Sequence, residues 1–283
     1  MQIFEALSLA CHELTHNAVI NPRVDAEILL ACSLGRSRSY LLAHFQDTVD
    51  ESLFSDFFCK VQERCKGKPL QYILGYQEFR GLEFEVSPAV FIPRPETEFV
   101  VKTALKYLVD SRLTIVDVGT GSGCLAVTLA KTLRHSRVWA IDLSESALKI
   151  ARRNADRHGV TQRVGFLQGD LLEPLTSLVG EGQIDAIVSN PPYVSQEELL
   201  TLQKEVRDWE PHLALVGQDP ESSIYPHLVS QSLMWLKPGG LLVMEIGYRM
   251  QEEVCALFRQ GWKRLKISED LSGIPRVVMG VKV

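Results

Sequence analysis

The sequence predicts an α/β fold, in which a doubly wound, mostly parallel sheet follows a small all-α domain and a β-hairpin linker. Three observations support this prediction. Apolar residues at helical spacing continue to about residue 75, a short alternating stretch surrounds Gly81, and strand-like and helix-like segments then alternate to the end of the chain. We therefore divide the chain into a helical domain at 1–75, a hairpin linker at 76–95 and an α/β domain at 96–283.

Capping signals place two helices in the first domain. Asn21 is the predicted N-cap of a helix that has Pro22 at its first position and Gly35 as its stop. A longer helix is expected to start near Asp50 and end at Gly67. Together with the remaining apolar spacing, these signals predict a bundle of four or five helices.

The linker alternates apolar and polar residues around Gly81, which predicts a β-hairpin. The apolar members are Phe79, Leu82, Phe84 and Val86. Pro88, Pro93 and Pro95 follow and stiffen the chain.

The α/β domain contains five segments that we expect to be parallel strands, with helices between them. The strand segments are 113–119, 137–142, 163–170, 184–190 and 241–247. The helical segments include 122–133, 144–158 and about 222–236. Two final β-rich segments, 262–270 and 275–283, are expected to add an antiparallel hairpin, which makes a seven-stranded sheet.

Composition excludes several classes of protein. Of the 283 residues, 46% are hydrophobic and 23% are charged, which is ordinary for a globular protein. The N-terminus has no basic region, Glu5 and Glu13 interrupt its apolar residues, and no apolar run approaches the roughly 20 residues of a membrane helix. The six cysteines include no C-x-x-C pair, so we expect reduced thiols and a cytoplasmic protein.

A glycine loop, "VDVGTGSGC", follows the first predicted strand and opens a helix. Gly119, Gly121 and Gly123 allow a tight turn and a close approach of a ligand to the helix N-terminus. A dinucleotide fingerprint would place its third glycine at position 124, where the chain has Cys124. The loop also lacks lysine and arginine, which indicates a nucleoside ligand without a phosphate and favours S-adenosylmethionine.

Three acids lie at the carboxyl ends of the first three predicted strands. Asp117 is placed to support the loop or to meet an ammonium group, and Asp142 is placed to accept both hydroxyls of a ribose. Asp170 is placed to meet the exocyclic amine of an adenine. Each acid has an alternative role as the N-cap of the next helix, but the ordered set fits adenosine better.

The segment Asn190-Pro191-Pro192-Tyr193 follows the fourth predicted strand. Because proline cannot donate to a ladder, the strand must stop here and its carbonyl groups become free. The side-chain oxygen of Asn190 and the carbonyl oxygen of Pro191 can both accept from one planar –NH₂ group, and the ring of Tyr193 can lie against it. The guests that fit are adenine, cytosine and a glutamine side chain; the alternative is a structural turn with a buried aromatic.

The glycine loop and the Asn-Pro-Pro-Tyr segment together resemble the amino-methylating branch of the class I S-adenosylmethionine-dependent methyltransferases, which have a Rossmann-like sheet. The segments "GKPLQYILGYQEFRGLEFEVSPAVFIPRPETE", "WEPHLALVG" and "DLSGIPRVVMG" narrow the resemblance to the HemK/PrmC family. Members of that family methylate the N5 nitrogen of a glutamine in peptide chain release factors. The resemblance covers nearly the whole chain.

The resemblance implies that the chain methylates the glutamine of the Gly-Gly-Gln motif in class 1 release factors, converts S-adenosylmethionine to S-adenosylhomocysteine, and docks the release factor on the helical domain. It implies three sets of site residues. The catalytic residues would be Asn190, Pro191 and Tyr193. The cofactor would contact Asp117, Gly119, Thr120, Gly121, Ser122, Gly123, Asp142, Asp170, Leu171 and Asn190. The substrate would contact Phe91, Asn190, Pro191, Pro192, Tyr193 and Glu210.

Three alternatives compete with this interpretation. "HELTH", from His12 to His16, matches the zinc pattern H-E-x-x-H, but no third ligand is nearby, and we expect no metal. An adenine-N6 or cytosine-N4 methyltransferase would use the same –NH₂ clamp but would need a basic surface. The net charge of −5 argues against a nucleic-acid partner and favours a protein substrate. We also expect a monomer with no membrane partner. A helical protein that only senses the cofactor would have no use for Asn190.

Overall fold

The computed structural model describes residues 1–216 and 223–283 of the chain, which form two compact units. The first unit contains Met1–Tyr76 and Gln203–Trp209, and the second contains Gln77–Leu202 and Glu210–Val283. The predicted hairpin linker is therefore almost entirely part of the second unit. The short segment 203–209 joins the first unit, which no pattern in the sequence indicated.

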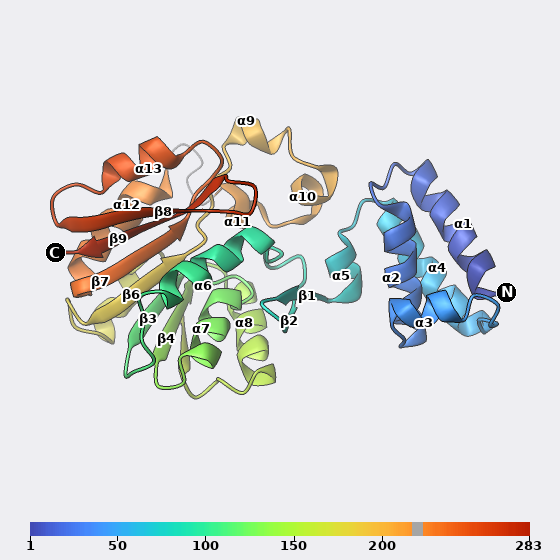
Figure 1. Ribbon diagram of the computed structural model, residues 1–283, viewed down its shortest axis with the longest axis horizontal. Helices are drawn as coiled ribbons and strands as arrows, with labels where there is room; N and C mark the ends of the chain where they lie inside the picture. Colours follow the sequence, from blue (N-terminus) through green and yellow to red (C-terminus); the bar gives the residue numbers. More distant parts are fainter. Residues whose placement is uncertain (217–222) are drawn as a thin grey trace. The chain divides into compact units, whose positions relative to one another are not determined.

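The first unit is all helical (Figure 1). Its helices are α1 (Ile3–His16), α2 (Pro22–Leu34), α3 (Arg38–Ala43), α4 (Glu51–Cys65), α5 (Leu70–Leu74) and α10 (Lys204–Trp209). The capping predictions are confirmed: α2 follows Asn21 with Pro22 at its first position and ends at Gly35, whose φ of 60° is left-handed. One apolar cluster, with Leu7 and Phe57 fully buried, forms the core of this unit.

The predicted hairpin is present as β1 (Tyr76–Phe79) and β2 (Leu82–Glu85). Both residues between the strands have positive φ, 51° at Arg80 and 72° at Gly81. This combination is the one that a tight two-residue hairpin turn requires. Phe79 and Phe84 are buried and pack edge to face with ring centroids 6.1 Å apart.

The second unit contains the predicted seven-stranded sheet, in the order β5-β4-β3-β6-β7-β9-β8. Strands β3 to β7 are parallel to one another, and β9 is antiparallel to both β7 and β8, which confirms the terminal hairpin. The strands are β3 (Thr114–Val118), β4 (Arg137–Asp142), β5 (Val164–Gln168), β6 (Ile184–Ser189), β7 (Leu236–Glu245), β8 (Trp262–Glu269) and β9 (Pro275–Lys282).

Helices cover both faces of this sheet, and successive residues of a strand point to opposite faces. Ile115 belongs to the apolar cluster under α6, α7 and α8, whereas Val116 belongs to the cluster under α12 and α13 (Figure 1). These helices are α6 (Glu98–Leu105), α7 (Cys124–Thr132), α8 (Glu145–Arg157), α12 (Ile224–Trp235) and α13 (Gln251–Leu257). Shorter helices are η1 (Pro95–Thr97), η2 (Glu173–Ser177), α9 (Gln196–Leu199) and α11 (His212–Val216). The doubly wound fold that the sequence predicts is confirmed.

The largest difference from the expected boundaries is in β7, which begins at Leu236 instead of residue 241. Leu236 pairs with Ile184 and Leu241 with Ala186, so a register shift leaves the Lys-Pro-Gly-Gly segment between them without a partner on β6 while the strand continues on both sides. The helix expected at about 222–236 is α12, and its expected first residue, Ser222, lies outside the described residues. Within the two described ranges, no helix is both long and apolar enough to cross a membrane.

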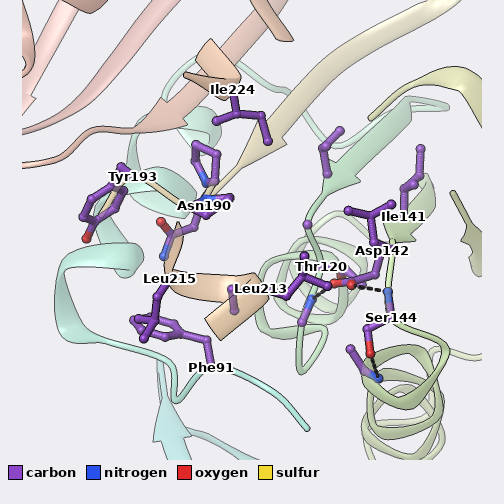
Figure 2. A pocket seen from close by; sticks show the side chains of 18 of the residues that line it. Phe91, Thr120, Ile141, Asp142, Ser144, Asn190, Tyr193, Leu213, Leu215 and Ile224 are labelled. Atoms are coloured by element: carbon purple, nitrogen blue, oxygen red, sulfur yellow. Dashed lines mark hydrogen bonds between the residues drawn. The ribbon is translucent and has the colours of Figure 1, made fainter. Parts of the chain in front are cut away.

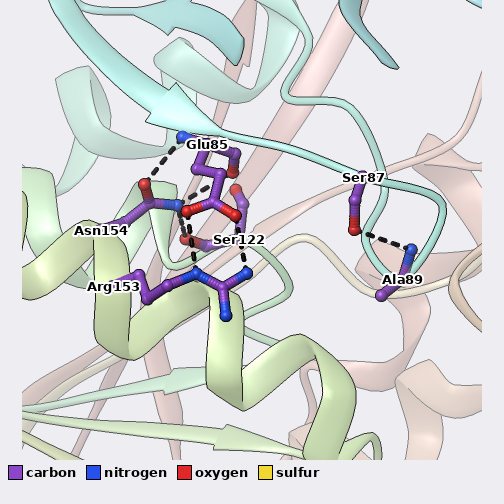
Figure 3. A network of polar contacts seen from close by, with 6 residues as sticks. All are labelled: Glu85, Ser87, Ala89, Ser122, Arg153 and Asn154. Atoms are coloured by element: carbon purple, nitrogen blue, oxygen red, sulfur yellow. Dashed lines mark hydrogen bonds and ion pairs between the residues drawn. The ribbon is translucent and has the colours of Figure 1, made fainter. Parts of the chain in front are cut away.

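A buried amide attaches the hairpin to α8 and to the glycine loop (Figure 3). Asn154, which is fully buried, accepts from the Glu85 N–H at 2.7 Å and donates to the carbonyl oxygens of Glu85, at 3.0 Å, and Ser122, at 2.8 Å. Its neighbour Arg153 binds the Glu85 carboxylate with two hydrogen bonds of 2.6 and 2.9 Å at the exposed surface. One residue of β2 is thus held by a buried contact and by an exposed one.

Removal of each of these two contacts should lower the free energy of unfolding by a different amount. Asn154→Ala leaves buried backbone groups of Glu85 and Ser122 without partners, so the free energy of unfolding should fall by about 2–4 kcal/mol. Arg153→Ala removes an exposed ion pair and should cost less than about 1 kcal/mol. Urea unfolding of the whole chain measures both. Equal effects of the two variants would contradict the assignment of the buried amide as the main attachment.

Candidate active site

A cavity of about 930 Å³ lies at the carboxyl ends of the parallel strands of the second unit. In Figure 2, Phe91, Asn190, Tyr193 and Leu215 form one side of it, and Thr120, Asp142 and Ser144 form the other. Open α/β sheets bind ligands at this edge, where the chain order reverses between neighbouring strands. Twelve of the fifteen predicted site residues line the cavity, namely Phe91, Gly119, Thr120, Gly121, Ser122, Asp142, Asp170, Leu171, Asn190, Pro191, Pro192 and Tyr193.

The three glycines of the loop have different roles. Gly119 and Gly121 have φ values of 69° and 55°, and a Cβ at Gly121 would meet no atom within 4 Å. Both residues line the cavity, so the missing side chains leave room for a ligand against the backbone. A Cβ at Gly123 would instead lie 3.1 Å from the Ala151 Cβ, so this glycine allows the loop to pack on α8.

Asp117 supports this loop from below and does not line the cavity. Its side chain is fully buried, and its Oδ2 accepts from the Thr120 hydroxyl at 2.6 Å and from the Ala126 N–H at 3.0 Å. Burial raises the pKa of Asp117 to about 7, against the effect of these two hydrogen bonds. Its Oδ1 has no partner among the described residues.

Asp142 lines the cavity at the end of β4. Its Oδ2 accepts from the Gly121 N–H at 2.8 Å and its Oδ1 from the Ser144 N–H at 2.9 Å. Burial raises the pKa of Asp142, and the two N–H groups oppose that rise. Because each carboxylate oxygen can accept a second hydrogen bond, Asp142 still has acceptor capacity for two hydroxyl groups.

Asp170 and Leu171 follow β5 and form another part of the wall. Asp170 is exposed, whereas Leu171 is buried and has a φ of 45°. A left-handed backbone is uncommon for leucine and costs of the order of 1–3 kcal/mol. Strain of this size at a cavity wall is typical of a position that is retained for a ligand.

The residues that the sequence predicts as acceptors follow the end of β6 and line the cavity. Ser189 is the last residue in the ladder, and its hydroxyl donates to the Val118 carbonyl oxygen at 2.8 Å. Asn190 donates from Nδ2 to the Thr97 hydroxyl at 3.0 Å. No described residue donates a hydrogen bond to Asn190 Oδ1 or to the carbonyl oxygens of Pro191 and Pro192. This part of the cavity wall therefore offers several acceptors to which no described residue donates, which suits an –NH₂ group.

Phe91 lines the cavity, and Glu210 holds the segment that carries it. Glu210 is buried, does not line the cavity, and accepts from the Ile92 N–H at 3.1 Å while it pairs with Arg94. The Arg94 guanidinium lies 4.7 Å from the centre of the Phe91 ring. Glu210, which the sequence placed at the substrate, thus lies one layer behind Phe91.

Two polar residues of this region were not identified from the sequence. Thr97 lines the cavity and binds Asn190, and Glu245 lies behind both at the end of β7. The available signal was the single acid in the apolar strand "LLVMEIG", because a carboxylate in a buried strand needs partners.

The zinc alternative has no support from side-chain geometry. His12 and His16 lie on α1 in the first unit. Across residues 1–216 and 223–283, no three His, Cys, Asp or Glu side chains are grouped in a way that could hold a metal ion.

Known proteins resemble this chain over its full length. Residues 5–75 match the family described as PrmC N-terminal domain, and residues 95–218 match the Methyltransferase small domain. A release factor glutamine methyltransferase of Koribacter versatilis is 43% identical over 286 residues, which are 100% of this chain and 99% of that protein. Proteins of the same name from Geobacter sulfurreducens and Bacillus subtilis are 41% and 38% identical, over 94% and 98% of this chain and 92% and 96% of their own.

Among solved structures, a methyltransferase from Pyrococcus furiosus shares the fold. Its TM-score is 0.51 at 18% sequence identity, over 72% of this chain and 90% of that one. The identities to the full-length relatives are far higher and extend over both units. The chain belongs to the release factor glutamine methyltransferase family.

Proposed function

We propose that this protein transfers a methyl group from S-adenosylmethionine to the N5 nitrogen of the glutamine in the Gly-Gly-Gln motif of class 1 peptide chain release factors. The observation that carries the proposal is the position of the free acceptors. Asn190 and Pro191 share one cavity with the glycine loop, so a carboxamide and a nucleoside cofactor can be held side by side. The product of the cofactor would be S-adenosylhomocysteine.

The residues around the glycine loop fit the proposed cofactor. Side chains at Gly119 and Gly121 would fill the space that the backbone leaves open, and Asp142 keeps acceptor capacity for the two hydroxyls of a ribose. Leu171 supplies an apolar wall for a planar base, and Asp170 lies beside it. No lysine or arginine lines this cavity among the described residues, in agreement with a ligand that has no phosphate.

Positioning is the main contribution of the protein to the reaction. An amide nitrogen is a weak nucleophile, because its lone pair is delocalised into the carbonyl group. When both N–H groups are held by Asn190 Oδ1 and the Pro191 carbonyl oxygen, the nitrogen is oriented and its developing positive charge is stabilised. Orientation of this kind can lower a barrier by about 7–11 kcal/mol in favourable cases. The cofactor supplies an activated methyl group on a sulfonium, and water accepts the released proton.

Tyr193 and Phe91 supply the apolar surfaces around the carboxamide. Both side chains lie on the same side of the cavity as Asn190 (Figure 2). Burial raises the pKa of the Tyr193 hydroxyl, and the nearby Glu245 raises it further, so this group stays protonated at neutral pH. Tyr193 is therefore a hydrogen-bond donor and a flat contact surface, and it does not act as a base.

The release factor is expected to dock on the helical domain, in the cytoplasm, and the enzyme is expected to act as a monomer without direct contact to nucleic acid. An adenine or cytosine in nucleic acid could occupy the same acceptors, but the net charge of −5 disfavours a phosphate backbone.

Methyl transfer to purified substrates tests the proposal. With radiolabelled S-adenosylmethionine, we expect label in a class 1 release factor and none in bulk DNA or ribosomal RNA. A release factor in which the glutamine of the Gly-Gly-Gln motif is replaced by alanine is the matched control and should stay unlabelled. Label in either nucleic acid, or in the alanine control, would refute the proposed substrate.

Asn190→Ala should remove most of the activity and leave cofactor affinity almost unchanged. The variant loses the side-chain acceptor, which should lower kcat by about 10²- to 10³-fold. Calorimetry with S-adenosylhomocysteine, beside the methyl-transfer assay, separates the two effects. Wild-type turnover in Asn190→Ala would eliminate the clamp as the catalytic element.

Asp142→Ala should weaken binding of S-adenosylhomocysteine by about 10- to 100-fold, because charge-assisted hydrogen bonds are lost. Asp185→Ala is a matched control. Asp185 also accepts from a backbone N–H, that of Thr114 at 2.7 Å, but it lies at the opposite end of the strands and outside the cavity. Calorimetry should give unchanged affinity for the control, and equal losses in both variants would point to a general effect on the sheet.

A further inference from the structure

Glu245 is a buried carboxylate that the proposed reaction leaves without a role. It is the last residue of β7 and only 2% exposed. In the parallel pairing of β6 and β7, Ser189 lies opposite Met244, so Glu245 lies at the level of Asn190. A buried charge is costly unless hydrogen bonds compensate it, and its retention beside the acceptor group therefore needs an explanation.

The carboxylate of Glu245 accepts from two residues of the cavity wall. Its Oε2 accepts from the Thr97 hydroxyl at 2.7 Å, and its Oε1 accepts from the Tyr193 hydroxyl at 3.3 Å. The first contact is short and buried, and the second is long. Thr97 is the stronger partner and is also the residue that binds Asn190.

The direction of these hydrogen bonds follows from the chemistry of the groups. An ionised carboxylate can only accept, so the single proton of the Thr97 hydroxyl must point at Glu245. The Thr97 oxygen can then only accept from Asn190, which requires the –NH₂ end of the Asn190 amide to face Thr97. The oxygen of that amide is left for the substrate.

We propose that Glu245 and Thr97 are positioning residues that fix the side-chain amide of Asn190 with its oxygen toward the substrate. The inference rests on the proposed function, in which Asn190 Oδ1 accepts from the glutamine amide. The two ends of an asparagine amide have nearly the same shape, so packing alone distinguishes them poorly. With the amide reversed, Asn190 would present a donor to the donors of the substrate and the clamp would fail.

The surroundings keep the carboxylate available for this role. Burial raises the pKa of Glu245 to about 7, and Glu96 adds to the rise; the hydrogen bonds from Thr97 and Tyr193 and the charge of Arg276 lower it. Arg276 also pairs with Asp270 at 2.9 Å, and the Tyr225 hydroxyl donates to the Glu245 backbone oxygen at 3.1 Å. Above pH 7 the Glu245 carboxylate is an ionised acceptor. The hydrogen bonds from Asn190 to Thr97 and from Thr97 to Glu245 then have a fixed direction.

Glu245→Gln tests this role because it keeps the shape and replaces one acceptor by a donor. The new –NH₂ can donate to Thr97, whose proton is then free to donate to a reversed Asn190. Above pH 7 we expect kcat with the release factor to fall by about 10²-fold, with unchanged affinity for S-adenosylhomocysteine and an unchanged KM for S-adenosylmethionine. Glu83→Gln is the matched control at an exposed ion pair and should behave as wild type.

Thr97 provides a second pair of variants, which decides the question if Glu245→Gln does not fold. Thr97→Val keeps the shape without the hydroxyl and should lose turnover like Glu245→Gln. Thr97→Ser restores the hydroxyl and should recover most of the turnover. A residue that only fills space would show no such difference between valine and serine.

The side-chain amide signals of Asn190 in isotope-labelled protein give a readout that does not depend on activity. We expect them to shift in Glu245→Gln and Thr97→Val and to stay in place in Glu83→Gln. Wild-type kcat in a folded Glu245→Gln, or unshifted Asn190 signals, would overturn the inference. Failure of the wild-type enzyme to label any release factor would refute the proposed function instead, and the Asn190 signals would still decide the orientation.

Discussion

The end of the β6 ladder at Ser189 is the constraint on which the site depends. Two consecutive prolines have no N–H to donate, so pairing with β7 and β3 cannot continue past Ser189. The carbonyl oxygens of Pro191 and Pro192 and the amide oxygen of Asn190 are left without donors from the described residues. Because β6 lies directly beside β3, this gap in the ladder is next to the glycine loop that follows β3. An unbroken strand would use the two backbone carbonyl oxygens to hold the sheet together.

Buried carboxylates support both walls of the cavity. Their main effect is to fix the direction of the hydrogen bonds around them, and the stability that they add is secondary. Asp117 lies under the glycine loop and accepts from Thr120 and Ala126, while Glu245 lies behind the acceptor wall and accepts from Thr97 and Tyr193. Replacing such groups by apolar residues of similar volume is often neutral or stabilising, so stability alone does not account for them. An acceptor-only group does, however, dictate which way every neighbouring hydroxyl and amide must point.

Local patterns were sufficient for the fold and for most of the cavity, since strand alternation, the glycine loop and the Asn-Pro-Pro-Tyr segment are each read within about ten residues. The supporting contacts join distant segments: Thr97 and Glu245 are 148 residues apart, and Glu85 and Asn154 are 69 apart. No spacing rule encodes such pairs, which explains why Glu245 and Asn154 were missed. The start of β7 was predicted too late for a related reason: Leu236 pairs with Ile184 ahead of the turn-like Pro-Gly-Gly stretch, which itself has no partner on β6.

One continuous stretch, from Glu85 to Thr97, contacts both walls of the cavity. At its start, Glu85 is bound by Asn154, which also binds the Ser122 carbonyl in the glycine loop. At its end, Thr97 binds Asn190 and Glu245, and Phe91 lines the cavity between these two points. Methyl transfer requires the reacting atoms to approach within about 3–3.5 Å in line, so the separation of the two walls must be held closely. A single segment that is anchored at both walls limits that separation more strictly than two independent loops would, because any displacement of one anchor strains the other.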